Sequence, residues 1–179
     1  STIAKQEPDP VEIINISDKV NEGLNLITYF GHSAPNLIEI DIGFVTDPVF
    51  GYNNTGKYPS FLINGCNAGS VFLNNELLGE NWVNAANLGA RNFIGHSSFG
   101  FASTLRSYSE YFYRIGFADS VFIRKGIGDV QKEVARQYMN ATSPLVTNIT
   151  QVQQMILLGD PAVRLLQHNE PDYVIDDSS

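Results

Sequence analysis

Three short apolar runs, rich in β-branched and aromatic residues, recur along the chain at residues 24–30 (LNLITYF), 61–64 (FLIN) and 92–95 (NFIG). Uninterrupted apolar runs of this length are typical of strands whose two faces are both buried. Each run ends in, or leads into, a glycine followed by a polar residue. The pattern therefore predicts three buried strands.

Between and after these runs, apolar residues recur three or four positions apart, the spacing that gives a helix one apolar face. The helical sets are Leu78, Trp82 and Ala85; Leu105, Tyr108, Phe112 and Ile115; and Val130 and Val134 with Tyr138 or Met139. A further helix is expected over residues 11–22, ended by Gly23, because glycine suits the left-handed position at a helix C-terminus. Strands that alternate with helices predict an α/β fold with a parallel sheet, since parallel strands need long crossover connections.

Two segments lie outside this alternation. Residues 45–59 (VTDPVFGYNNTGKYP) separate the first two strands, and their Gly, Pro and Asn content predicts a long surface loop, a kind of segment that is often functional. Residues 169–179 (NEPDYVIDDSS) form a polar acidic tail, for which we expect little packing. Residues 1–168 are long enough to form one domain with a sizeable core.

The composition narrows the classes of function. The formal net charge of −8 at pH 7, without a stripe of Lys or Arg, argues against nucleic-acid binding. A single cysteine excludes an internal disulfide, and with only three histidines the chain has too few ligands for a typical structural zinc site. No apolar stretch approaches the ~20 residues of a membrane-spanning helix, and the first ten residues lack the order of a signal peptide. We therefore expect no nucleic-acid partner and no membrane span in this chain.

The segment GYNNTGK, residues 51–57, matches the G-x-x-x-x-G-K pattern of phosphate-binding loops. The Ser or Thr that follows the lysine in such loops is replaced by Tyr58. Pro59 then leads into a predicted strand, whereas a phosphate-binding loop leads into a helix whose N-terminus holds the phosphate. We interpret the segment as a glycine-rich turn.

The segment GHSSFG, residues 95–100, offers a possible serine nucleophile, Ser97, after the third strand. Asp160 and His168 follow in the Ser, Asp, His order of α/β-hydrolases, but Phe99 occupies the position where the nucleophile elbow has glycine. A serine hydrolase that uses these three residues stays an alternative.

A histidine and the only cysteine each follow the end of a predicted strand. His32 follows the first strand and Cys66 follows the second. Ligands of open parallel sheets bind at the carboxyl ends of the strands, so both side chains are expected at the binding edge. A thiol and an imidazole there have the chemistry of a cysteine peptidase, whereas a lone Cys66 is more often a packing residue.

Five segments, in this order, resemble motifs of the gingipain family of cysteine peptidases, and together they cover nearly the whole chain. They are TYFGHSA, FLINGCNAGSVF, LLGENWVNAANLGA, RNFIGHSS and LLGDPAVRLL. The resemblance implies a caspase-like fold, an α/β three-layer sandwich with a mostly parallel sheet, of which residues 1–168 would form the C-terminal portion. It also implies a cysteine endopeptidase, or the related sortase of Bacteroidetes type IX secretion.

The resemblance assigns roles at the matching positions. Cys66 would be the nucleophile and His32 the general acid/base, with the backbone N–H groups of Cys66 and Ser33 as oxyanion donors. Phe99 or Phe101, after the third strand, would wall the pocket for the substrate's P1 side chain. The family usually has glycine where this chain has Ser33, so either the local backbone differs or the oxyanion hole is distorted.

The resemblance also implies partners and a location. The substrate would be a polypeptide, the N-terminal half of the catalytic domain would be a partner, and the protein would be secreted or lie at the bacterial cell surface, on the outer membrane. Gingipains bind structural calcium, but this sequence has no clustered D-x-D-x-D loop, so no metal or cofactor is placed. The alternative is a catalytically inactive domain of the same fold that acts as a binding or scaffold module.

Overall fold

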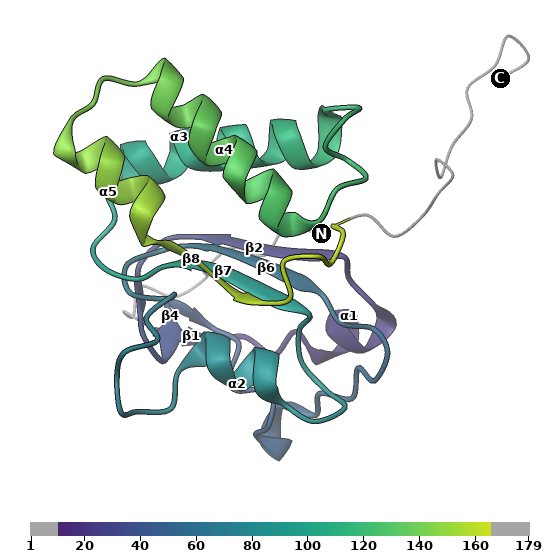
Figure 1. Ribbon diagram of the computed structural model, residues 1–179. Helices are drawn as coiled ribbons and strands as arrows, with labels where there is room; N and C mark the ends of the chain where they lie inside the picture. The colour runs from purple at the N-terminus through teal and green to yellow at the C-terminus, as the bar shows by residue number, and fades with distance from the viewer. Residues whose placement is uncertain (1–10, 166–179) are drawn as a thin grey trace, which may run out of the picture.

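The computed structural model describes residues 11–165, and a four-stranded sheet lies at its centre (Figure 1). The strands, in their order across the sheet, are β2 (Leu26–Phe30), β6 (Ser60–Asn64), β7 (Asn92–His96) and β8 (Met155–Gly159). β2, β6 and β7 are parallel, whereas β8 runs antiparallel to β7. The three predicted strands are confirmed to within two residues at each end, but burial on both faces is confirmed only for β6 and β7, because β2 is an edge strand with Thr28 and Phe30 exposed. β8 is a fourth strand that the apolar pattern did not single out.

The two central strands, β6 and β7, are buried along their whole length. Successive side chains of a strand point to opposite faces, so Phe61, Ile63 and Phe93 lie in one core and Leu62 and Ile94 in the other. Burial on both faces explains why these strands have uninterrupted apolar sequences.

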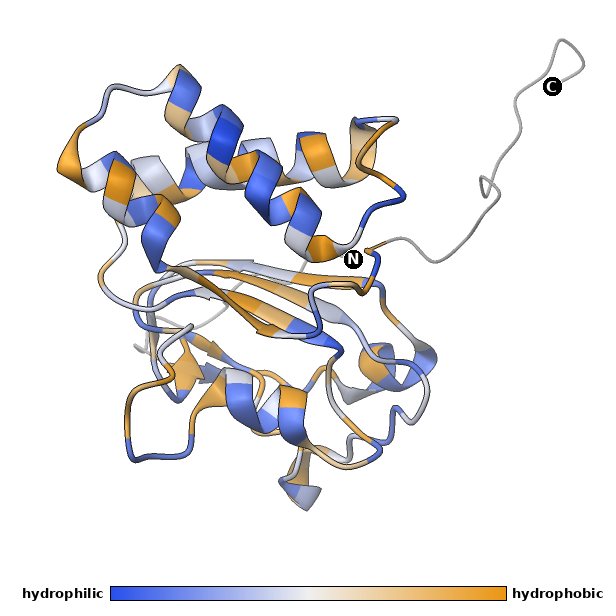
Figure 2. Ribbon diagram, in the orientation of Figure 1, coloured by the Kyte–Doolittle hydropathy of each residue, from blue (hydrophilic) through white to orange (hydrophobic). Residues whose placement is uncertain are grey.

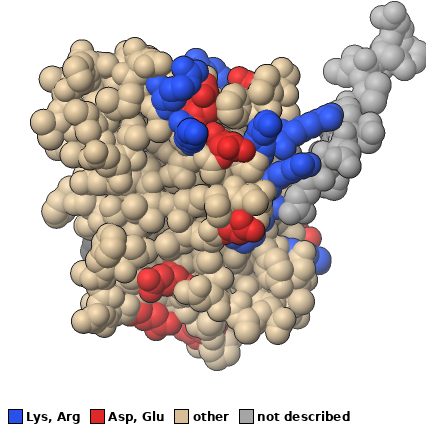
Figure 3. Space-filling model, in the orientation of Figure 1, with Lys and Arg blue, Asp and Glu red and all other residues tan. Residues whose placement is uncertain are grey.

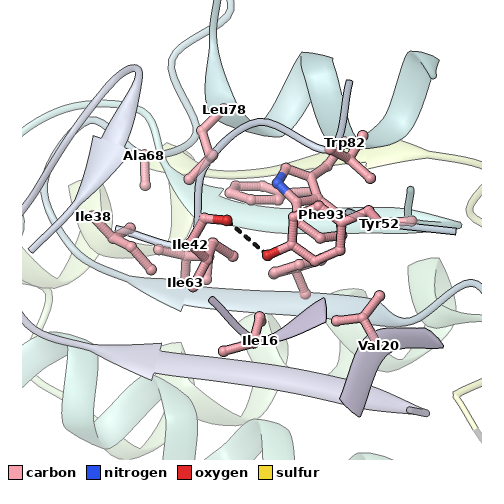
Figure 4. Close-up of a cluster of buried hydrophobic side chains, with 13 residues drawn as sticks. Ile16, Val20, Ile38, Ile42, Tyr52, Ile63, Ala68, Leu78, Trp82 and Phe93 are labelled. Atoms are coloured by element: carbon pink, nitrogen blue, oxygen red, sulfur yellow. Dashed lines mark hydrogen bonds between the residues drawn. The ribbon is translucent and has the colours of Figure 1, made fainter. Parts of the chain in front are cut away.

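One face of the sheet is covered by α2 (Leu78–Asn84), with α1 (Ser17–Glu22) at its side. Trp82 is fully buried there, and Figure 4 shows its ring beside that of Tyr52. The indole ring packs edge-on against both Tyr52 and Phe61. The indole nitrogen donates to the Gly43 carbonyl at 3.0 Å, which satisfies the one polar atom of the side chain.

The other face is covered by three helices and a π-helical turn, which form the upper layer in Figure 1. They are α3 (Ala102–Tyr113), η2 (Arg114–Ala118), α4 (Ile127–Ala141) and α5 (Val146–Gln154). The predicted stripes of α3 and α4 are confirmed, and Tyr138, not Met139, is the fully buried residue of the latter. Figure 2 shows the apolar sheet between the two outer layers. The predicted α/β three-layer fold with a mostly parallel sheet is thereby confirmed.

The predicted helix over residues 11–22 is wrong in its first half. In place of a first helical turn, the segment forms the strand β1 (Glu12–Ile13), which pairs in parallel with β5 (Ile40–Asp41). The helix starts only at Ser17, whose N–H donates to the Asn15 side chain at 2.8 Å, and it ends at Gly23 as predicted, where φ is 112°. Pairing with β5 therefore outweighs the helical periodicity of this segment.

The long segment 45–59 packs more closely than a surface loop. It contains the short helix η1 (Pro48–Phe50); Tyr52 packs in the core that contains Trp82, and Asn54 is fully buried. The segment then enters β6 without a helix, which confirms that GYNNTGK is a turn and not a phosphate-binding loop.

The face shown in Figure 3 carries both positive and negative side chains. Lys and Arg gather mainly on the upper helical layer, with acidic side chains among them. Among the described residues, none of the helices is long and apolar enough to span a membrane. His168 and the predicted tail over residues 169–179 lie outside the described residues.

Candidate active site

The parallel strands bring the predicted site residues to one edge of the sheet. His32 follows β2 by two residues, Cys66 follows β6 by two residues, and the loop over residues 97–101 follows β7 directly. The strands β2, β6 and β7 share a direction, so these segments meet beyond the same carboxyl ends. In Figure 1 this edge lies beside the end of α5, because Met155 pairs with His96.

Two glycines let the turn that carries Cys66 fit between its neighbours. A Cβ atom at Gly65 would overlap the Ser33 side chain and would lie 2.9 Å from the Gly31 carbonyl oxygen. A Cβ atom at Gly69 would overlap the Gly95 carbonyl on the other side. The spacing G-C-x-x-G is therefore a packing requirement of this edge. We call residues 65–69 the cysteine turn.

Backbone strain in the cysteine turn falls on Asn67, directly after the cysteine, whose φ is 60°. Asparagine tolerates this left-handed conformation better than most residues, and such outliers cluster at functional sites. Ser33 is not strained, because it lies in the short strand β3 (Ser33–Ala34), which pairs with β4 (Leu37–Ile38). Of the two alternatives for Ser33, the structure therefore shows a local backbone that does not need glycine.

The Cys66 thiol is half-buried and belongs to neither hydrophobic core. Its sulfur accepts a hydrogen bond from the Gly100 N–H at 3.4 Å, and the thiol donates to the Gly100 carbonyl oxygen, which lies 3.7 Å from the sulfur. The backbone of Gly100 thus contacts the thiol through both its N–H and its carbonyl oxygen. The sequence predicts that the segment containing Gly100 lies near the site, but it does not predict the contact of Gly100 with the sulfur.

The segment around His32 is attached to the cysteine turn through its backbone. The Ser33 hydroxyl donates to the Cys66 carbonyl at 2.7 Å, and the Gly31 N–H donates to the Asn64 carbonyl at 3.1 Å. The His32 carbonyl in turn accepts from the Tyr29 hydroxyl at 2.7 Å. These bonds place the backbones of the two predicted catalytic residues side by side.

The His32 side chain is exposed, and no hydrogen bond joins its imidazole to Cys66 among the described residues. The Cys66 N–H, one of the two predicted oxyanion donors, makes no backbone hydrogen bond within the described part of the chain. The catalytic roles of Cys66, His32 and Ser33 stay predictions.

Exposed large apolar side chains lie close, along the sequence, to the two residues that meet at the sulfur contact. Phe99 and Phe101 flank Gly100 and are 76% and 59% exposed. Phe72 and Leu73, which the sequence argument missed, are also exposed and follow the cysteine turn closely. Exposed large apolar side chains often mark a binding surface when they form a patch, so these four residues are candidates for contact with a substrate.

The alternative grouping of Ser97 with Asp160 and His168 is wrong. Ser97 follows β7 at the edge where Met155 lies, whereas Asp160 follows the antiparallel β8 at the opposite end of the sheet. A strand of this length separates them by roughly 15 Å. The Asp160 carboxylate accepts instead from the Ala162 N–H at 2.8 Å.

The described residues contain no group of three or more His, Cys, Asp or Glu side chains that could hold a metal ion. Structural calcium therefore has no assigned position within residues 11–165.

The fold is shared with solved peptidases. The complex of the pro- and mature domains of Porphyromonas gingivalis RgpB matches with a TM-score of 0.71 and 17% identity, over 82% of this chain and 35% of that one. The Arg-specific cysteine proteinase gingipain R (RGPB) matches with a TM-score of 0.70 and 17% identity, over 86% and 36% of the two chains. The present chain thus spans about a third of the length of these proteins, and identities this low show the fold alone.

No curated protein sequence matches the chain. A sequence model of peptidase family C25 matches residues 2–166. Since that match covers nearly the whole chain and the fold agrees with gingipain structures, the chain belongs to peptidase family C25, the gingipain family of cysteine peptidases.

Proposed function

We propose that this chain carries the catalytic edge of a gingipain-like cysteine endopeptidase, with Cys66 as nucleophile and His32 as general acid/base. The observation that carries the proposal is the contact of the Gly100 N–H with the Cys66 sulfur, 3.4 Å away, at the carboxyl edge of a parallel sheet. The bond between Ser33 and the Cys66 carbonyl supports the pairing with His32, because it holds the two segments together.

The proposed reaction is a two-step acyl transfer. The Cys66 thiolate attacks the carbonyl carbon of a peptide bond, and the N–H groups of Cys66 and Ser33 receive the negative oxygen. The tetrahedral intermediate then expels the amine, which takes a proton from the His32 imidazolium. Water attacks the resulting thioester while His32 removes its proton, and Cys66 leaves as a thiolate.

The exposed aromatic group supports a polypeptide substrate. Phe99 and Phe101 stand on either side of the residue that contacts the sulfur, so a peptide bound at Cys66 would lie against them. We propose that one of them forms a wall of the P1 pocket.

The test is the reactivity of the thiol. We expect iodoacetamide to alkylate Cys66 at least about tenfold faster than a cysteine in an unstructured peptide, and we expect His32→Ala to remove that excess, because a neighbouring imidazolium favours the thiolate. Asn36→Ala is the matched control, since Asn36 is exposed in the turn between β3 and β4. Reaction of Cys66 at the peptide rate, unchanged by His32→Ala, would refute the catalytic proposal.

A second candidate function is an inactive domain of the same family that acts as a binding or scaffold module. The observation that favours it is the exposed His32 side chain, which makes no hydrogen bond with Cys66 among the described residues. Retention of peptide binding by the Cys66→Ser and His32→Ala variants, together with an unreactive thiol, is the result expected of such a module.

The outer edge of β2 supports a further part of the same proposal. β2 pairs only with β6 among the described strands, and an apolar cavity of about 220 Å³ lies beside it. Its lining is mostly apolar and includes Leu26, Ile27 and Ile40. We propose that further strands of a longer catalytic domain continue the sheet at this edge, in keeping with the 35% coverage of the RgpB chain.

A further inference from the structure

His96, the last residue of β7, is a buried polar side chain that the proposed reaction does not use. It is 1% exposed, and its Nδ1 atom lies 2.8 Å from the Ser98 carbonyl oxygen. A carbonyl oxygen can only accept a hydrogen bond, so Nδ1 carries the proton and donates it. Burial lowers the pKa of the imidazole, which favours the neutral form of the ring.

The Ser98 carbonyl is a junction between two segments of the site. It also accepts a hydrogen bond from the Asn67 N–H at 2.9 Å. The loop over residues 97–101 is thus joined to the cysteine turn at the residue that follows Cys66. The Ser70 hydroxyl, one residue beyond the cysteine turn, donates to the Ser97 carbonyl at 3.0 Å and makes a second link to the loop.

The His96 backbone belongs to the same junction. Its carbonyl accepts from the Gly69 N–H at 3.0 Å, so backbone and side chain of one residue contact both the cysteine turn and the loop. The opposite side of the loop is held separately, because the Ser97 N–H donates to the Gln154 carbonyl at 2.8 Å. The loop therefore keeps an anchor to the fold that does not depend on the imidazole.

Two residues beyond Ser98, the Gly100 N–H meets the Cys66 sulfur. We propose that His96 is a positioning residue, whose Nδ1–H holds the Ser98 carbonyl and thereby directs the Gly100 N–H at the nucleophile. The inference rests on the proposed role of Cys66. It concerns a residue that touches neither the sulfur nor a substrate, and it makes the reactivity of Cys66 depend on a buried histidine from the neighbouring strand.

The chemistry explains why histidine suits this position. An apolar side chain would fill the space below the loop and would leave the Ser98 carbonyl with one donor, the Asn67 N–H. Asparagine places an amide N–H close to where Nδ1 lies, since both atoms are two bonds from Cβ. His96→Asn therefore preserves the hydrogen bond, and His96→Leu removes it at similar burial.

The experiment compares these two variants with the unaltered chain in two measurements. The first is the rate constant for alkylation of Cys66 by iodoacetamide, and the second is amide hydrogen exchange in residues 97–101. We expect His96→Leu to slow alkylation about tenfold and to accelerate exchange in the loop. We expect His96→Asn to stay within about threefold of the unaltered chain in both.

Two results would overturn the inference. One is a folded His96→Leu variant with unchanged alkylation and exchange, and the other is an equal loss in both variants. If His96→Leu does not fold, the test rests on His96→Asn. Accelerated hydrogen exchange in residues 97–101 of His96→Asn would contradict the positioning role. Failure of the catalytic proposal is visible separately, as an unaltered Cys66 that reacts no faster than a cysteine in a peptide while loop exchange still responds to His96→Leu.

Discussion

Replacement of Gly69 by alanine is expected to move the cysteine turn away from β7. The added Cβ atom would overlap the Gly95 carbonyl and would lie 3.0 Å from the Gly95 Cα atom. These are backbone atoms of a fully buried strand, so no flexible side chain can give way. The turn itself must shift, and the Cys66 sulfur must then move relative to the Gly100 N–H.

The magnitude follows from the kind of contact that is violated. Overpacking of a close-packed site costs about 1–3 kcal/mol, and the rigidity of β7 places Gly69→Ala near the upper end. Gly116→Ala is the matched control, because its Cβ would meet mainly a flexible methyl group of Leu165 at 2.9 Å, far from the site. Urea unfolding should show a loss of about 2–3 kcal/mol for Gly69→Ala and less than about 1 kcal/mol for Gly116→Ala.

The decisive assay is alkylation of Cys66 by iodoacetamide under conditions where both variants are folded. We expect the rate constant to fall about tenfold in Gly69→Ala and to stay unchanged in Gly116→Ala, because a lost hydrogen bond to a charged group is worth about 1.5–3 kcal/mol. A Gly69→Ala variant with unchanged stability and unchanged alkylation would show that the turn does not depend on its close approach to β7.

Three further outcomes are expected. Trp82→Ala should lower the free energy of unfolding by about 3–5 kcal/mol in urea titration, since it empties the centre of one core and leaves the Gly43 carbonyl without its donor; a loss under 1 kcal/mol contradicts this. Asn54→Ala should cost about 2–3 kcal/mol by the same assay, because its side chain exchanges two hydrogen bonds with Gly89, whereas an unchanged midpoint would show that water replaces them. Burial holds the pKa of the His96 imidazole below its unfolded value of about 6.5. The neutral His96 therefore contributes its full stability above about pH 6.5, and this contribution is lost as the pH falls from there towards the folded pKa. Between about pH 7.5 and 5, the free energy of unfolding should fall less in His96→Asn than in the unaltered chain.

The local sequence was sufficient for most of the sheet and helices. The runs that became β6 and β7 are uninterrupted because both faces of the sheet are covered there, and the stripes of α3 and α4 repeat because one face of each helix is buried. Burial of this kind produces a periodic pattern of apolar residues along the chain, so these elements can be predicted without knowing what packs against them. The approach of His32 and Cys66 to one edge followed from the parallel order of these strands.

The two errors of the secondary-structure prediction, before Ser17 and at β8, have the same cause. The segment before Ser17 has apolar residues at helical spacing, but hydrogen bonds with the distant β5 make it a strand. The apolar residues of β8 follow α5 without a break, so periodicity alone could not tell a strand from a longer helix. In both places the choice of backbone conformation depends on a neighbour that is remote along the chain.

By itself, the sequence determined the family, the three-layer fold and the presence of a thiol and an imidazole at matching strand ends. Only the tertiary structure decided what surrounds them: the extended backbone of Ser33, the contact of Gly100 with Cys66, and the bond from His96 to Ser98. The physical reason is that secondary structure follows from the burial pattern of neighbouring residues. A hydrogen bond between two turns depends instead on how closely the strands beneath them pack, and no local pattern of residues records that distance.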